Sequence, residues 1–167
     1  MAGLQAYLRS KVAVIEPNEF VARLLKTLLN NYGFTLITVF SSMEAFAKRA
    51  DDKAFGVIIC KKDLPSSSGL RLLKLIRSGK TPVRYDIPFI LFLENAEPKL
   101  VFEARDTGVN EICVEPITAA NLYKKLKLCF EQPRAFITDS GYIGPDRRRK
   151  QDPNYQGPER RGTSVAA

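Results

Sequence analysis

Histidine is absent from the 167-residue sequence, cysteine occurs only three times, and no apolar run is long enough to cross a membrane. A membrane helix needs roughly 18 consecutive apolar residues. The lack of histidine excludes most serine-hydrolase, zinc-enzyme and phosphohistidine chemistries. Cys60, Cys113 and Cys129 have no CxxC spacing, which argues against a disulfide framework and against a zinc site. The N-terminus has no secretory-signal pattern, so we expect a reduced, cytoplasmic protein without a bound metal or other cofactor.

The charge is unbalanced, with 26 Lys and Arg against 18 Asp and Glu, a formal net charge of +8. A positive excess favours a phosphate-bearing or acidic partner and carries no information about the fold. The length fits one ordinary domain with a tail.

Short β-branched runs alternate with amphipathic segments between residues 11 and 131. The runs predict five strands buried on both faces: Val12–Ile15, Leu36–Val39, Val57–Cys60, Phe89–Leu93 and Ile112–Val114. Capping residues and apolar spacing predict five helices: Asn18 to about Asn31, Ser41 or Ser42 to about Ala50, Ser68 through Ile76, Pro98 to Thr107, and Thr118 through Phe130. Five βα units predict an α/β fold with a doubly wound, five-stranded parallel sheet.

The composition changes after Glu131, where the chain becomes rich in Gly, Pro, Arg and Asp. Such a segment can bury little apolar surface, so we expect residues 135–167 to be disordered when alone. The sequence therefore predicts a globular domain over residues 10–131 and an arginine-rich tail over residues 132–167.

Several motifs of the globular part together resemble a CheY-like receiver domain. They are Val14-Ile-Glu-Pro-Asn18, Leu64-Pro65 with Gly69 four residues on, Pro88 before a strand, and Gly108 leading to Glu115-Pro116. The resemblance implies the flavodoxin-like strand order 2-1-3-4-5, with the functional crevice at the carboxyl ends of the strands.

The resemblance also implies a phosphoacceptor pocket, and here that pocket is degenerate. Active family members use an acidic pair for Mg²⁺, a phosphoacceptor aspartate, a Thr or Ser, and a lysine. The corresponding positions hold Glu16 followed by Pro17, Lys61, Leu93 and Glu115. An amine cannot form an acyl phosphate, so we expect no phosphotransfer and no enzymatic activity. We expect the Lys61 ammonium to form an ion pair facing Glu16 and Glu115, with Asp63 nearby; the alternative is a catalytic lysine, for which no base or electrophile partner is visible.

The tail contains a duplicated heptad. Tyr142-Ile-Gly-Pro-Asp-Arg-Arg148 recurs 13 residues later as Tyr155-Gln-Gly-Pro-Glu-Arg-Arg161. At roughly 5% usage per residue type, five identities in register arise by chance about once in millions of pairings. We interpret the repeat as a true duplication, which suits a ligand with duplicated features.

Each heptad carries the groups that recognise a guanine and its phosphate. Guanidinium groups stack on bases and bind phosphate, a carboxylate accepts hydrogen bonds from the guanine edge, and tyrosine offers a stacking face. Two copies fit cyclic di-GMP, which has two guanines and two phosphates. The predicted site comprises Tyr142, Gly144, Asp146, Arg147, Arg148, Arg149, Tyr155, Gly157, Glu159, Arg160 and Arg161.

The tail also resembles the arginine-rich extension of the Cle proteins, CheY-like cyclic di-GMP effectors of bacterial motors. The resemblance implies cyclic di-GMP bound by the tail, singly or as a stacked pair, docking to the flagellar switch protein FliM, and recruitment to the flagellated pole. The alternative is an RNA- or DNA-binding regulator that uses the same arginines, because charge runs commonly form nucleic-acid arms.

Overall fold

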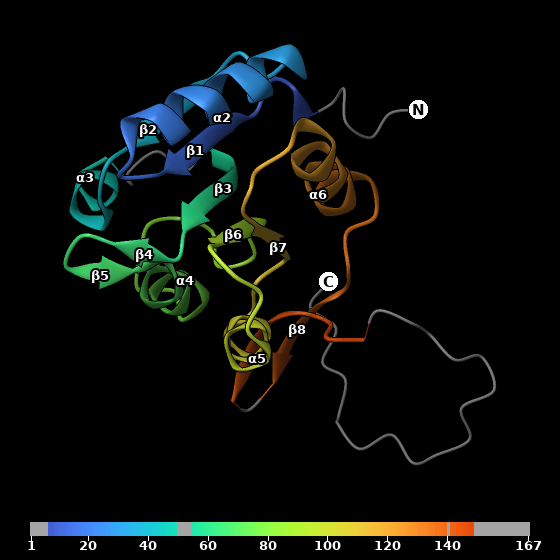
Figure 1. Ribbon diagram of the computed structural model, residues 1–167. Helices are drawn as coiled ribbons and strands as arrows, with labels where there is room; N and C mark the ends of the chain where they lie inside the picture. Colours follow the sequence, from blue (N-terminus) through green and yellow to red (C-terminus); the bar gives the residue numbers. More distant parts are fainter. Residues whose placement is uncertain (1–6, 50–54, 140, 149–167) are drawn as a thin grey trace.

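The structure is a computed structural model that describes residues 7–49, 55–139 and 141–148 (Figure 1). The elements are β1 (Lys11–Ile15), α2 (Glu19–Asn31), β2 (Ile37–Phe40), α3 (Met43–Ala47), β3 (Phe55–Lys61), β4 (Asp63–Leu64), β5 (Ser67–Ser68), α4 (Gly69–Arg77), β6 (Phe89–Leu93), α5 (Pro98–Thr107), β7 (Glu111–Val114), α6 (Ala119–Glu131), β8 (Phe136–Asp139) and β9 (Tyr142–Pro145).

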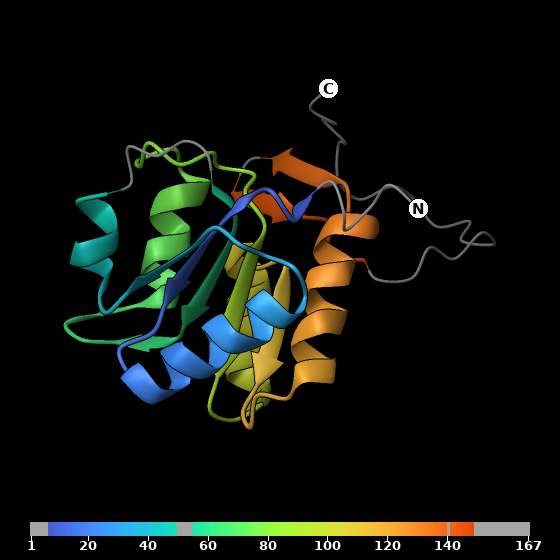
Figure 2. The same ribbon diagram turned by 90° about the horizontal axis from the view of Figure 1, so that it is seen from above.

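The centre of the molecule is a five-stranded parallel sheet in the order β2-β1-β3-β6-β7. Because strands β6 and β7 are the fourth and fifth of this sheet along the chain, the order is the predicted 2-1-3-4-5. Helices α2 and α6 cover one face, while α3, α4 and α5 cover the other (Figures 1 and 2). The predicted doubly wound α/β fold is confirmed.

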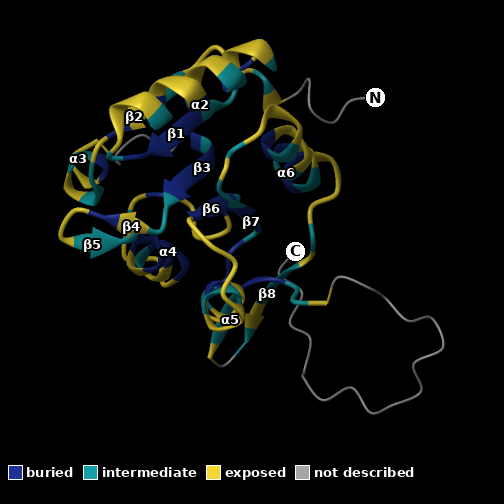
Figure 3. Cartoon of the chain, viewed as in Figure 1, coloured by how far each residue is buried: buried dark blue, intermediate teal, exposed yellow. Residues whose placement is uncertain are grey.

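Each face of the sheet has its own apolar core. On one face Ile15, Ile58 and Leu91 pack with residues of α3, α4 and α5. On the other, Val14 and Ile59 pack with residues of α2 and α6. Strand β6 is buried along its whole length, as Figure 3 shows, because it lies inside the sheet with helices on both sides.

The helices begin at the polar residues that the sequence indicates. The side chain of Asn18 accepts hydrogen bonds from Phe20 N at 2.9 Å and Val21 N at 3.3 Å, and so satisfies donors that the first turn of α2 leaves free. Ser42, rather than Ser41, caps α3. Helix α3 ends at Ala47, before the predicted limit near Ala50, and residue 50 lies outside the described residues.

The beginning of the tail corrects the prediction of disorder from residue 135. Strands β8 and β9 form an antiparallel hairpin in which Phe136 pairs with Pro145 and Asp139 with Tyr142. The hairpin packs beside α5 (Figure 1). A composition rich in Gly, Pro and Arg obscured a run of β-branched and aromatic residues that buries one side against the globular domain.

Candidate functional site

The four positions of the degenerate pocket meet at the carboxyl edge of the sheet. Glu16 follows β1, Lys61 ends β3, Leu93 ends β6 and Glu115 follows β7. Lys61 Nζ lies 2.7 Å from Glu115 Oε1 and 3.2 Å from Glu94 Oε1. Burial alone would lower the pKa of Lys61, but the hydrogen bonds to Glu115 and Glu94 outweigh it, so the pKa of Lys61 is raised and the ammonium stays charged.

Glu16 is the buried acid of this pocket, with 2% of its surface exposed. Its Oε1 atom accepts a hydrogen bond from Asn18 N at 2.9 Å, while its Oε2 atom has no hydrogen-bond partner. Burial raises the pKa of Glu16, and the hydrogen bond from Asn18 and the charge of Lys61 offset this only in part.

The ion-pair interpretation of Lys61 is confirmed for Glu115, and Glu16 lies close enough for its charge to act on Lys61, as expected; the outcome differs from the prediction at Asp63. Asp63 pairs with the neighbouring Lys62, with 2.7 Å between Nζ and Oδ1. Glu94 joins Lys61 instead, and sequence reasoning missed it. Its position directly after Leu93, at the end of a buried strand, was the signal, because such residues share the carboxyl edge of the sheet.

Two arginines anchor the hairpin to the amino-terminal side of β7. Arg134 donates to Asp146 O at 2.7 Å and also hydrogen-bonds Asn110 O. Arg77, only 4% exposed, donates to Gly108 O at 3.0 Å and to Asn110 Oδ1 at 2.8 Å, and its guanidinium lies 5.2 Å from the centre of the Phe136 ring. Sequence reasoning singled out none of these anchoring contacts.

The hairpin carries the first copy of the duplicated heptad, Tyr142 to Arg148. Tyr142 and Gly144 lie in β9, and Asp146, Arg147 and Arg148 follow it. The Tyr142 hydroxyl donates to Pro145 O at 2.6 Å. Burial raises the pKa of Tyr142, although the neighbouring Arg147 acts in the opposite direction.

Arg147 is held on both sides in this arrangement. Its guanidinium carbon lies 3.9 Å from the centre of the Tyr142 ring, and its Nη1 atom lies 3.2 Å from Oδ1 of Asp106 on α5. Its buried Nε atom has no hydrogen-bond partner. The Asp146 side chain accepts from Arg148 N at 2.9 Å, which shapes the turn after β9.

Glycine is required where the hairpin meets the end of α5. A Cβ atom on Gly144 would lie 2.6 Å from the Cα atom of Gly108, and one on Gly108 would lie 2.4 Å from Ile143 O. Gly108 also has a φ of +94°, a conformation that favours glycine. The glycine of the first heptad therefore has a packing role in this structure.

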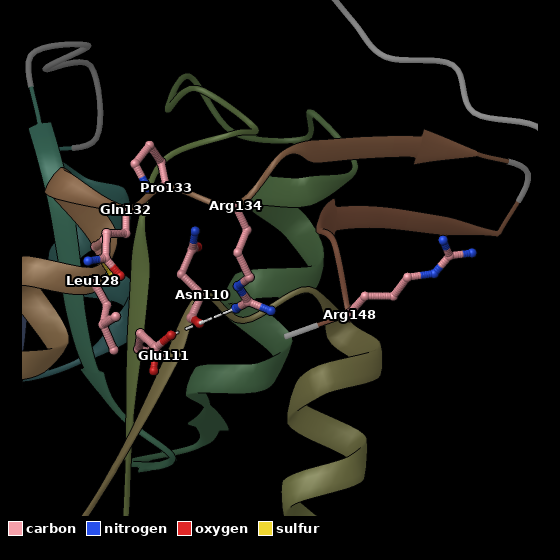
Figure 4. Close-up of a pocket in the computed structure, with 8 residues that line it drawn as sticks. Asn110, Glu111, Leu128, Gln132, Pro133, Arg134 and Arg148 are labelled. Atoms are coloured by element: carbon pink, nitrogen blue, oxygen red, sulfur yellow. Dashed lines mark hydrogen bonds and ion pairs between the residues drawn. The ribbon is translucent and has the colours of Figure 1, made fainter. Parts of the chain in front are cut away.

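A cleft of about 280 Å³ lies between α6, the start of β7 and the residues that flank the hairpin. Figure 4 shows the Arg134 side chain reaching towards Asn110 and Glu111, while Arg148 points away from them. Glu111 also pairs with Lys125, with 2.9 Å between Oε2 and Nζ. This cleft borders the first heptad and carries charges of both signs.

The structure brings together only part of the predicted nucleotide site. Arg149, Tyr155, Gly157, Glu159, Arg160 and Arg161 lie outside the described residues. The first heptad and the degenerate pocket lie at opposite ends of the sheet: in Figure 2 the hairpin is beyond the amino ends of the strands, away from their arrowheads. The two predicted sites are therefore spatially separate.

The sequence pattern of the response regulator receiver domain family matches residues 12–127. The chain belongs to this family. The matched region ends before the hairpin, so the duplicated heptad lies outside the part that receiver domains share.

Individual receiver proteins are similar to most of the chain. Chemotaxis protein CheY-3 of Vibrio cholerae serotype O1 is 28% identical over 130 residues, covering 73% of this chain and 92% of that protein. Chemotaxis protein CheY of Pseudomonas aeruginosa is 24% identical over 122 residues, covering 73% of this chain and 97% of that protein. Among solved structures, CheY4 of Vibrio cholerae superposes with a TM-score of 0.64 at 18% identity, covering 71% and 97% of the two chains, which shows the shared fold.

The receiver pocket of this chain does not fit the magnesium ion that the family implies. A related receiver domain, that of sensor histidine kinase PA1611 from Pseudomonas aeruginosa, is described with magnesium coordinated in its active-site cleft. Here Pro17 offers no carboxylate beside Glu16, and the Lys61 ammonium pairs with the acids that remain. The described residues contain no cluster of three or more His, Cys, Asp or Glu side chains suited to a metal.

The three cysteines are buried. Burial raises the pKa of each thiol, that of Cys129 to about 12, so the reactive thiolate form is suppressed. No helix in the described ranges is both long and apolar enough to cross a membrane.

Proposed function

We propose that this receiver protein is a non-enzymatic effector of cyclic di-GMP, which binds the duplicated heptads of the tail and orders them. The receiver domain then docks a partner protein, and ligand binding in the tail controls that interaction. Phosphorylation has no role in this scheme, since Lys61 replaces the acceptor aspartate.

The duplication of the YxGP[DE]RR pattern carries this proposal. A solvated basic tail does not require two heptads in register, and an acid in each copy weakens a surface that binds phosphate alone. The same acid suits a guanine edge, which presents two N–H donors to one carboxylate.

The placement of the first copy supports the proposal. Arg148 is exposed and Asp146, which follows β9, is half-buried, so both residues are at least partly accessible to a ligand. The cleft beside them is also lined by Arg134. A ligand with two negative charges would meet several guanidinium groups there.

The partner is proposed from the family resemblance. The tail is similar to that of the Cle proteins, and CleD is the member it most resembles. This similarity supports docking to the flagellar switch protein FliM, and through it an effect on motility and surface attachment. Relatives of this chain are named chemotaxis proteins, which is consistent with a docking partner in the flagellar motor.

Calorimetric titration of cyclic di-GMP into the full chain tests the proposal. We expect binding by the unaltered chain and loss of binding when Arg147→Ala is combined with Arg160→Ala, which removes one arginine from each heptad. Arg71→Ala, an exposed arginine on α4, is the matched control for lost charge. Absence of binding by the unaltered chain contradicts the proposal, as does unchanged affinity of the double variant with an unchanged circular dichroism spectrum.

Salt dependence separates this function from binding of RNA or DNA. Neutralising about five backbone phosphates gives a log–log slope of about −3.5 to −4.5. A ligand with two charges, held mainly by stacking and base edges, depends far less on salt. Tighter binding of a DNA or RNA oligonucleotide than of cyclic di-GMP, with the steep slope, would favour the nucleic-acid regulator.

A further inference from the structure

The first heptad adopts a closed arrangement in which its key groups bind other parts of the same chain. Arg147 covers one face of the Tyr142 ring at 3.9 Å. The Nη1 atom of Arg147 lies 3.2 Å from a carboxylate oxygen of Asp106, which belongs to the last turn of α5. One face of the Tyr142 ring is thus occupied by the arginine of the same heptad and is closed to a stacking base.

The anchoring contacts hold the whole hairpin against the receiver domain. Gly144 packs on Gly108 so closely that neither position has room for a Cβ atom. On the opposite strand, the Phe136 ring lies 5.6 Å from the ring of Tyr85 and packs on the guanidinium of Arg77. These contacts hold β9, and with it the residues that follow it, next to the end of α5.

We propose that the C-terminal end of α5 is a docking surface for the first heptad and competes with the anionic nucleotide for it. Asp106 takes the place of the ligand phosphate on Arg147, and Arg147 takes the place of the guanine on Tyr142. This inference rests on the proposed function, because it assigns the regulation of that same site. The nucleotide binds only the released heptad, so docking lowers its apparent affinity.

The competition connects the ligand to the receiver surface. Helix α5 and β9 are in direct contact, and Asp106 and Gly108 lie at the end of this helix. Nucleotide binding would uncover them, so the surface around the end of α5 would differ between the free and bound states. A partner that prefers one of these states would then respond to the ligand, and by linkage would change its affinity in return.

The affinity of the full chain for cyclic di-GMP, measured by calorimetry, tests the competition. Asp106→Asn keeps the shape of the side chain and removes the charge that pairs with Arg147 and also with the neighbouring Arg105. We expect it to bind the nucleotide about two- to fivefold more tightly, the range that one partly exposed ion pair allows. Phe136→Ala removes the packing of β8 on Tyr85 and Arg77, which weakens the attachment of the hairpin to the receiver domain. It leaves every residue of the heptad intact, so we expect it to tighten nucleotide binding as well.

Asp63→Asn is the matched control for Asp106→Asn. Asp63 also pairs with a cation, Lys62, with 2.7 Å between Nζ and Oδ1, and its side chain is 61% exposed against 49% for Asp106. It follows β3 at the carboxyl edge of the sheet, whereas the heptad lies beyond the amino ends of the strands. The control therefore removes the same charge from an exposed ion pair without touching the heptad or its anchors, and its affinity should equal that of the unaltered chain.

Each result of this experiment has a distinct meaning. No binding by the unaltered chain overturns the proposed function itself. If the unaltered chain binds and the affinity of either Asp106→Asn or Phe136→Ala fails to exceed that of Asp63→Asn, the nucleotide binds the docked heptad, and the competition is wrong while the proposed function stands. Weaker binding by Asp106→Asn would make Asp106 a supporting residue of the ligand site and also overturn the competition.

Discussion

Lys61 and Glu115 form an ion pair 2.7 Å long at the place where a phosphorylatable receiver holds an aspartate and a lysine with the opposite arrangement of charges. The exchange preserves the attraction between β3 and the segment after β7, and it removes the group that accepts phosphate. The pocket thus keeps an ion pair between these two positions while it lacks the carboxylate that accepts phosphate. The match to the receiver family ends at residue 127, so the tail lies outside it, and the proposed function assigns control of the domain to this tail.

The Lys61 ion pair should contribute to stability more than an exposed pair does. The Lys61 side chain is 13% exposed, and its removal leaves Glu16, Glu94 and Glu115 without their cation. We expect Lys61→Ala to lower the free energy of unfolding by about 1 to 2 kcal/mol in urea denaturation. Lys62→Ala, whose pair with Asp63 is more exposed, is the control and should cost less than about 0.5 kcal/mol. Equal effects of the two substitutions would contradict the assignment.

Acetyl phosphate with Mg²⁺ should leave the chain unphosphorylated. Lys61 cannot form an acyl phosphate, Pro17 offers no ligand for the ion, and Leu93 is a fully buried apolar side chain without a hydroxyl. Intact-protein mass spectrometry should show no added phosphoryl group after incubation. A product with the mass of a single phosphoryl adduct, lost on treatment with hydroxylamine, would show that another carboxylate replaces the acceptor.

The buried Arg77 should be one of the most important residues for stability outside the apolar core. It donates to Gly108 O, Ile87 O and Asn110 Oδ1, at 3.0, 2.9 and 2.8 Å. Burial lowers its pKa to about 10, still high enough to keep it charged at neutral pH. We expect Arg77→Ala to cost about 2 to 4 kcal/mol, because these buried acceptors lose their donor.

Arg71→Ala on the exposed side of the same helix is the control for Arg77→Ala and should change the free energy of unfolding by less than about 0.5 kcal/mol. Urea denaturation of both variants checks the difference. If Arg77→Ala lowers the free energy of unfolding no more than Arg71→Ala does, water satisfies the buried acceptors nearly as well as the guanidinium.

The sheet could be predicted from the sequence because strands buried on both faces leave uninterrupted β-branched runs, such as Val57–Cys60. The docking of the hairpin could not, because it depends on contacts between distant residues, such as Arg134 with Asn110 and Gly108 with Gly144. The hairpin itself had a local signal: Phe136-Ile-Thr-Asp139 and Tyr142-Ile are separated by only two residues, the second of which is Gly141. The composition of the whole tail concealed this signal.

Glu16 should make the stability of the protein depend on pH. Burial raises its pKa above the ordinary value of 4.5, so the folded state binds this proton more tightly than the unfolded state does. The folded state therefore gains stability from this group below pH 4.5 and loses that gain as the pH rises through the folded-state pKa.

Glu16→Gln removes this pH-dependent loss of stability and retains an oxygen that can accept from Asn18 N. In urea denaturation, its stability relative to the unaltered chain should therefore increase between about pH 4 and neutral pH. Glu19→Gln, an exposed glutamate on α2, controls for the lost charge. A relative stability of Glu16→Gln that stays constant or decreases towards neutral pH would mean that Lys61 and Asn18 stabilise the Glu16 carboxylate more than burial destabilises it.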